Sequence, residues 1–229
     1  LLRKPCATEL MRLNKSFIVK RSAKVLFEMM KAFSELSAYI AHSLAEGSSI
    51  WIAQKEGRAK DGDDRTDPAI LKMFYMAGKQ QKMAFADYMQ RLNIVPVAIS
   101  YEFDPGDEAK ARELVERAQS GSYEKGEFED IDSIVAGIVG FKGRVHVSLG
   151  APIQAPYDTP EALAAAIDQA IHSQYRLFPS NLLAAGQGAG ISEAERQQFL
   201  ERLARMPAEL QETARAMYAR PVLNQQSAS

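Results

Sequence analysis

Two short apolar stretches of this sequence each end in charged side chains that suit an anionic ligand. FIVKR, residues 17–21, ends in a basic pair, and IWIAQKEGR, residues 50–58, ends in an acid, a glycine and an arginine. A glycine lets a ligand approach the backbone closely, and the fork of an arginine matches two phosphate oxygens. If both stretches are strands that end at one edge of a sheet, where α/β proteins place their ligands, they form a phosphate site. Its residues would be Lys20, Arg21, Glu56, Gly57 and Arg58.

Each stretch also has a simpler interpretation when it is taken alone. The basic pair fits a surface boundary between a strand and a helix, and the acid with the arginine fits a solvated loop that carries an ion pair. Only the two stretches together favour phosphate. Met73, Phe74 and Met76 follow the second stretch and could line an acyl channel, because methionine adapts to irregular apolar shapes. Core packing is the other interpretation of these three residues.

The composition indicates a folded chain with no overall field for anions. The chain has 229 residues, of which 46% are hydrophobic and 25% are charged, and this is ordinary for a globular protein. Its formal net charge is -1. A nucleic-acid-binding surface is therefore not indicated, and any anion site must be local.

Cysteine use and the length of apolar runs limit the class of protein further. The single Cys6 excludes an internal disulfide framework and a multi-cysteine metal site, and it is compatible with a reducing compartment. Residues 61–64, DGDD, lack the ligand spacing of a calcium loop and predict a solvated turn. No apolar run approaches the ~20 residues that span a bilayer. We therefore expect a cytoplasmic chain without a metal site.

Strands alternate with helices over the first two thirds of the chain. Apolar spacing predicts a helix over residues 26–44 and another over 107–119. An Asp-Pro pair opens a helical region over 67–92, which we expect to be broken near Gly78. The predicted strands are residues 17–19, 50–53, 94–101 and 144–149. This order predicts an α/β fold with a mixed sheet flanked by helices.

The last third of the chain predicts helices alone. A Thr-Pro pair at residues 159–160, a capping box that begins at Ser192, and Pro207 each predict a helix start. The glycines of AAGQGAG, residues 184–190, follow a helical pattern instead of a strand. They therefore predict a linker and not a phosphate-binding loop.

The chain thus divides into an α/β domain over residues 1–157 and a helical C-terminal region over residues 158–229. The task of the second region is open. It could bind a partner or pack on the main domain, in either case through Phe199, Leu203, Met206 and Leu210.

The order and spacing of these blocks resemble those of the glycerolipid acyltransferase family, whose members acylate glycerol 3-phosphate or its monoacyl derivative. FIVKR is similar to the second block of that family, and IWIAQKEGR is similar to the third. NIVPVAIS, residues 93–100, is similar to the fourth block, and GRVHVSLGAPI, residues 143–153, is similar to the closing strand. The resemblance covers residues 1–155. It implies an acyltransferase-like α/β domain in which the five residues named above bind the glycerol phosphate head group.

The sequence departs from the family pattern in two blocks. In the third block, Gln54 and Lys55 replace the usual Phe-Pro, and no threonine separates Gly57 from Arg58, which affects substrate preference. The family's first block is His-x-x-x-x-Asp, in which the imidazole takes the proton of the acceptor hydroxyl. No histidine of this sequence has an aspartate five residues later, so we expect that block upstream of Leu1. We assign no catalytic role to His42, His146 or His172.

The resemblance implies an acyltransferase of phospholipid synthesis. The acyl group would come from a thioester on coenzyme A or acyl carrier protein as co-substrate, and it would pass directly to a glycerol phosphate or monoacylglycerol phosphate acceptor. No cofactor, metal or nucleic acid is implied, whereas the substrate class implies peripheral contact with a membrane. The alternative is a noncatalytic lipid- or anion-binding protein on the same scaffold. An upstream His-x-x-x-x-Asp would favour the enzyme.

Overall fold

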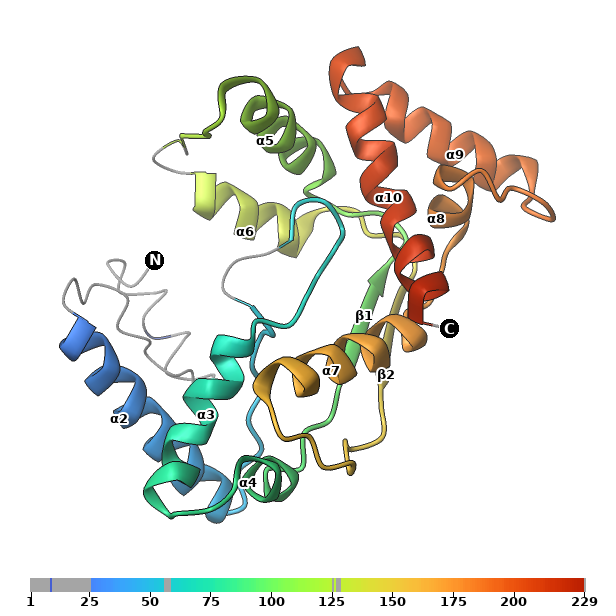
Figure 1. Ribbon diagram of the computed structural model, residues 1–229. Helices are drawn as coiled ribbons and strands as arrows, with labels where there is room; N and C mark the ends of the chain where they lie inside the picture. Colours follow the sequence, from blue (N-terminus) through green and yellow to red (C-terminus); the bar gives the residue numbers. More distant parts are fainter. Residues whose placement is uncertain (1–8, 10–25, 56–58, 125, 127–128, 229) are drawn as a thin grey trace.

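Helices make up most of this protein, as the computed structural model in Figure 1 shows. The structure describes residues 9, 26–55, 59–124, 126 and 129–228, and it is 60% helical. The helices are α2 (Leu26–Ala45), α3 (Pro68–Gln80), α4 (Phe85–Arg91), α5 (Asp107–Ser120), α6 (Glu129–Val139), α7 (Pro160–Gln174), α8 (Pro179–Ala184), α9 (Glu193–Ala204) and α10 (Ala208–Ala228). The strands are β1 (Val97–Tyr101) and β2 (Val145–Leu149).

The two described strands form one antiparallel sheet near the centre of Figure 1. The register runs from the pair Val97 and Leu149 to the pair Tyr101 and Val145. Pro96 stands just before β1, where its carbonyl oxygen accepts a hydrogen bond from Gly150 N at 2.9 Å but its ring offers no N–H in return, so the ladder ends there. Both strands lie inside the stretches in which the sequence predicts them.

The predicted mixed sheet flanked by helices is not what the described residues form. A combination of helices with some sheet is confirmed, but this sheet has two antiparallel strands. The predicted strand at residues 50–53 is wrong, because this segment pairs with no described strand, and Trp51 is 66% exposed. An apolar run becomes a strand only where a neighbour supplies its hydrogen bonds. The predicted strand at residues 17–19 lies outside the described residues.

Local capping signals locate the helix starts correctly. At the start of α3, Asp67 Oδ1 accepts a hydrogen bond from Ala69 N at 2.8 Å. At the start of α7, Thr159 Oγ1 accepts from Ala162 N at 3.2 Å. The predicted capping box at Ser192 forms with the glutamate three residues later. Each cap satisfies backbone N–H groups that the helix itself leaves without an acceptor.

The break in the second helical region lies later than the sequence predicts. α3 continues through Gly78 and ends at Gln80, and Lys82 takes a positive φ of 57° before α4 begins. Gly78 serves packing instead, since a Cβ there would lie 2.3 Å from Cγ of Tyr88. The Tyr88 ring of α4 therefore rests directly on the backbone of α3.

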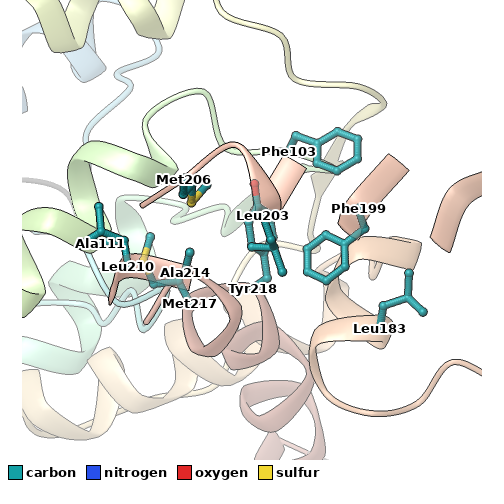
Figure 2. Packing of buried hydrophobic residues seen from close by; sticks show 10 residues of the cluster. All are labelled: Phe103, Ala111, Leu183, Phe199, Leu203, Met206, Leu210, Ala214, Met217 and Tyr218. Carbon is teal, nitrogen blue, oxygen red and sulfur yellow. The ribbon is translucent and has the colours of Figure 1, made fainter. Parts of the chain in front are cut away.

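Two apolar clusters form the core, and each joins early and late parts of the chain. The first, shown in Figure 2, consists of Phe103, Ala111, Leu183, Phe199, Leu203, Met206, Leu210, Ala214, Met217 and Tyr218. The second consists of Leu71, Ala77, Phe85, Tyr88, Met89, Leu163, Ala164 and Ile167. The predicted domain boundary between residues 157 and 158 runs through both clusters, and it stays a prediction.

The four apolar residues of the C-terminal region that could have met a partner are buried in the first cluster. Phe199 is 1% exposed, Leu203 and Leu210 are 3% exposed, and Met206 is 5% exposed. The ring of Phe199 meets the ring of Tyr218 edge to face, with centroids 5.4 Å apart. These residues therefore pack on the rest of the protein, which was one of the two interpretations.

The two faces of β1 differ sharply in burial. On one face, Ala98 and Ser100 are 1% and 0% exposed, and the Arg176 N–H that follows α7 donates to Ser100 Oγ at 3.0 Å. The opposite face is apolar and open to solvent. It consists of Ile99, Tyr101, Val145, Val147 and Leu149.

α6 is a helix that the sequence patterns did not predict. Ile138 and Val139, near its end, are 73% and 75% exposed. Neither α6 nor any other described helix is long and apolar enough to cross a bilayer.

Candidate functional site

The five predicted ligand residues lie outside the described residues, so the phosphate site stays a prediction. These residues are Lys20, Arg21, Glu56, Gly57 and Arg58. The structure describes the chain on each side of the second group, which is residues 50–55 and residues 59–66. Both segments contribute to the lining of one large cleft.

The cleft has a volume of about 1540 Å³. Its walls come from α2, α3, both strands, the first turns of α5, one side of α6, and the facing sides of α7 and α10. Ordinary pockets for small molecules hold ~300–1000 Å³, so this cleft has room for a longer ligand. Trp51 and Gln54 line it before the predicted ligand residues, and Lys60 lines it after them.

One part of the cleft lining is apolar. Of the three residues that could form either an acyl channel or core, Phe74 lines the cleft, whereas Met73 is buried and 8% exposed. Met76 does not belong to the lining. The apolar part is made by Ile40, Leu44, Leu71, Phe74, Ile94, Val97, Ile99 and Leu149.

Another part of the lining is ionic, and three of its cations are paired with carboxylates. The pairs are Lys60 with Glu113 at 2.6 Å, Lys110 with Asp104 at 2.5 Å, and Arg112 with Glu108 at 2.7 Å. Glu113 is 2% exposed, whereas the side chains of Arg112 and Glu108 are about half exposed. An anionic ligand that met these three cations would have to compete with their carboxylates.

Residues 59–66 are anchored at their end to α7. Thr66 donates from both its backbone N and its Oγ1 to Asp168 Oδ1, at 2.7 and 2.6 Å. Asp67 N donates to Gln54 O at 2.8 Å, which joins the two ends of the loop. The loop also bonds to itself, because Ala59 N donates to Asp64 Oδ1 at 3.3 Å. The DGDD turn is therefore only partly the solvated turn that was predicted.

The three histidines lie in different surroundings. His42 on α2 is exposed and meets Glu46 at 3.4 Å, away from the cleft. His146 on β2 is also exposed. His172 on α7 lines the cleft, with its Nε2 atom 3.3 Å from the backbone oxygen of Asp64. Within the part of the chain that the structure describes, a carbonyl and not a carboxylate faces this ring, whereas the His-x-x-x-x-Asp block would supply an acid partner.

Two buried carboxylates tie β1 and α5 to later parts of the chain. Glu102 accepts from Arg144 Nε at 3.0 Å and from Nη2 at 2.6 Å, and this hydrogen bonding raises the pKa of Arg144. Asp107 Oδ2 accepts from Arg202 Nε at 2.6 Å and from the Tyr218 hydroxyl at 2.7 Å. Burial raises the pKa of Tyr218, and the charge of Asp107 raises it further. Both carboxylates are therefore occupied in holding the fold.

Sequence reasoning missed the acids that anchor the cleft wall. Asp168 had a usable signal, because it directly follows Ile167 and lies four residues after Ala164 on the buried stripe of α7. An acid on such a stripe needs a buried partner. Glu113 had no such signal, since α5 carries many charges and its sequence alone does not show which of them is buried.

No group of three or more His, Cys, Asp or Glu side chains is placed to hold a metal ion in the part of the chain that the structure describes. A scan against protein-family models, a search of curated proteins and a search of solved structures each gave no match to this chain. The resemblance to glycerolipid acyltransferases therefore stays a prediction from the sequence blocks.

Proposed function

We propose that this protein is a glycerolipid acyltransferase that moves a fatty acyl group from an acyl thioester to a glycerol phosphate or monoacylglycerol phosphate. The observation that carries the proposal is the cleft, which joins an apolar part to an ionic part beside residues 50–55 and 59–66. A glycerolipid substrate has the same two parts. The thioester, on coenzyme A or acyl carrier protein, is the co-substrate, and phospholipid synthesis is the setting.

The apolar part of the cleft suits an acyl chain. Ile99 and Tyr101 line the cleft from the open face of β1 and are 39% and 37% exposed, and Leu149 beside them is 71% exposed. Large apolar patches on a protein surface commonly mark binding sites. Each methylene that such a wall removes from water contributes about 0.8 kcal/mol to binding. The wall would therefore contribute to the affinity for an acyl chain, and it would contribute nothing to the binding of a purely polar acceptor.

The head group is proposed to lie at the predicted ligand residues, among which Arg58 supplies the two-pronged contact to phosphate. The reaction is a direct transfer. The acceptor oxygen bonds to the acyl carbon, the carbon–sulfur bond breaks, the thiol leaves, and a base takes the hydroxyl proton. The sequence contains no His-x-x-x-x-Asp, and among the described residues His172 meets a backbone carbonyl and no acid, so we propose that the base is supplied from upstream of Leu1.

Cytoplasmic location with peripheral membrane contact belongs to the same proposal, because a monoacylglycerol phosphate acceptor resides in a membrane surface. Glycerol phosphate acceptors and the thioester carrier are the proposed partners.

A second candidate function is noncatalytic binding of a lipid or an anion on the same scaffold. It is favoured by the pairing of three cations that line the cleft, because Lys60, Lys110 and Arg112 each meet a carboxylate. It is also favoured by His172, whose ring meets a backbone carbonyl. A binding protein needs the apolar wall but no base.

Thioester consumption separates the two functions. The printed 229-residue chain and a form extended upstream to include the expected block would each be assayed with glycerol 3-phosphate and with its monoacyl derivative. We expect turnover only in the extended form. Turnover by the printed chain that His172→Ala abolishes would instead make His172 the base, and binding without turnover in either form would favour the second candidate.

Arg58→Lys tests the proposed head-group contact in the extended form. Losing a bidentate contact to phosphate should cost ~2–4 kcal/mol of binding, which is ~30-fold or more in use of the acceptor. The free energy of unfolding should change by ~1 kcal/mol or less if Arg58 is exposed in the absence of ligand. Normal acceptor kinetics in this variant would remove Arg58 from the site.

A further inference from the structure

Three helices hold residues 59–66, the segment that directly follows the predicted Glu-Gly-Arg ligands in the sequence. Figure 1 shows this segment passing among helices that are far from it in sequence. The holding contacts come from α5, α7 and α10. We propose that three features fix this segment in the cleft wall and thereby set the affinity for the acceptor. They are Asp168, Glu113 and the close packing of Gly62 against α10. The link to the acceptor rests on the proposed acyltransferase function.

The contact from α7 consists of two buried hydrogen bonds. Asp168 is 8% exposed and Thr66 is 7% exposed, so water does not compete freely for their hydrogen bonds. One carboxylate oxygen accepts both donors of Thr66. A carboxylate among apolar neighbours is costly unless it is bonded, so its presence on the buried face of α7 indicates a role for this bond.

The contact from α5 is an ion pair. Glu113 receives Lys60 at 2.6 Å on one oxygen and Arg117 at 2.8 Å on the other. The Lys60 side chain is 23% exposed, so the pair lies at the wall of the cleft and not in bulk water. Glu113 therefore fixes the position of Lys60 and of the segment that carries it.

The contact from α10 is a close approach of the Gly62 backbone to Met217 and Arg220. Gly62 has a φ of +80°, and a Cβ there would lie 2.6 Å from the backbone oxygen of Met217 and 3.2 Å from Cβ of Arg220. Any side chain at this position would push the segment away from α10. The C-terminal helices, which the sequence left without a task, thus touch the cleft wall directly.

The first test uses Asp168→Ala with Asp168→Asn as the conservative variant. Asparagine keeps an oxygen that can accept both Thr66 donors, whereas alanine removes it. Bonds to a charged acceptor are worth about tenfold or more in an equilibrium. In the extended form, Asp168→Ala should raise the KM for monoacylglycerol phosphate by about tenfold while kcat and the KM for the thioester stay within about twofold, and Asp168→Asn should restore the KM.

The same variants are compared by deuterium exchange of the peptide that covers residues 59–67. Exchange should be about tenfold or more faster in Asp168→Ala, with β1 and β2 peptides unchanged, because only the local opening becomes easier. A rise in exchange across the whole protein, or an unchanged acceptor KM with a loosened segment, would overturn the positioning role.

Two further pairs of variants keep the test independent of how Asp168→Ala folds. Glu113→Gln is matched with Glu116→Gln, an exposed acid on the same helix. Gly62→Ala is matched with Gly121→Ala, because Gly121 has a similar φ of +77° but nothing within 4 Å of an added Cβ. We expect the first member of each pair to raise the acceptor KM and to loosen residues 59–67. Equal effects in both members of a pair would refute that contact.

The inference and the proposed function fail in different ways. If no form consumes the thioester, the proposed function is wrong, and protection by glycerol 3-phosphate then decides the inference. Protection of residues 59–67 in the wild type that Asp168→Ala loses would support it. No protection in the wild type would show that this wall does not belong to an acceptor site.

Discussion

The two faces of the β1–β2 sheet reverse the usual relation between side-chain size and burial. The buried face carries Ala98 and Ser100, and the open face carries Ile99 and Val147, which are 39% and 54% exposed. The small residues allow α7 and the chain after it to approach the strands closely. Of the large residues, Ile99 lines the cleft and Val147 lies outside its lining, and both are exposed in the described protein. This contrast shows that the described helices cover one face and leave apolar side chains of the other face exposed, which makes the second face a candidate binding surface.

The largest effect on the free energy of unfolding is expected from removing the buried carboxylate of Asp107. Asp107→Ala would leave the Arg202 guanidinium and the Tyr218 hydroxyl without their shared acceptor, and breaking a buried pair costs ~3–5 kcal/mol. Urea unfolding measures this loss. Glu108→Ala is the matched control, because its pair with Arg112 is half exposed and is worth ~1 kcal/mol or less. Equal losses in the two variants would contradict the assignment of Asp107 to the core.

A smaller loss is expected from filling the buried face of the sheet. Ala98 is 1% exposed, so Ala98→Leu forces extra volume against α7 and should lower the free energy of unfolding by ~1–3 kcal/mol. Thermal unfolding of this variant would be compared with that of the wild type. A tolerated leucine would mean that the helix packing over β1 is looser than the structure shows.

The covered side of the sheet should also affect how the free energy of unfolding changes at alkaline pH. Tyr175 follows α7, and its burial raises the pKa of the phenol from 10 to about 12. A raised folded-state pKa means that this contribution to stability is complete below pH 10 and is lost as the pH rises towards 12. Between these values the free energy of unfolding should fall by up to ~1.4 kcal/mol per pH unit through this group. Tyr175→Phe should flatten that slope, and an unchanged slope would exclude Tyr175 as its source.

The smallest effect is expected on the open face. Val147 is 54% exposed and does not belong to the cleft lining, so Val147→Thr should change the free energy of unfolding by ~0.5 kcal/mol or less. Urea unfolding beside Ala98→Leu makes the two faces directly comparable. A loss as large as that of Ala98→Leu would show that the open face is covered in solution.

Local chemistry explains which parts of the fold could be predicted. Asp67, Thr159 and Ser192 cap their helices with hydrogen bonds inside a single turn, so a few neighbouring residues determine the outcome. The stretches around β1 and β2 were found because β-branched runs suit strands. The pairing of strands depends on residues far apart, and residues 50–53 show that a suitable run without a paired neighbour is not a strand.

The candidate site was harder to predict, for the same physical reason. The charged ends of the two apolar stretches suggested ligands, but those five residues lie outside what the structure describes. The acids that hold the cleft wall, Glu113 and Asp168, look like ordinary helix charges in the sequence. Their burial depends on contacts with Lys60 and Thr66 from a different part of the chain. Spacing along one helix cannot show such contacts.

The first core cluster also constrains the order of events during synthesis. Arg202 leaves the ribosome 95 positions after Asp107, which at the usual ~5–20 residues per second is a delay of several seconds or more. During that interval α5 has been made, but the charge that neutralises its buried acid has not. Phe103 and Ala111 likewise wait for the later helices that cover them. The nascent protein therefore has to carry an unfinished core until α9 and α10 emerge, and this is the stage at which we expect it to be most prone to aggregate or to need a chaperone.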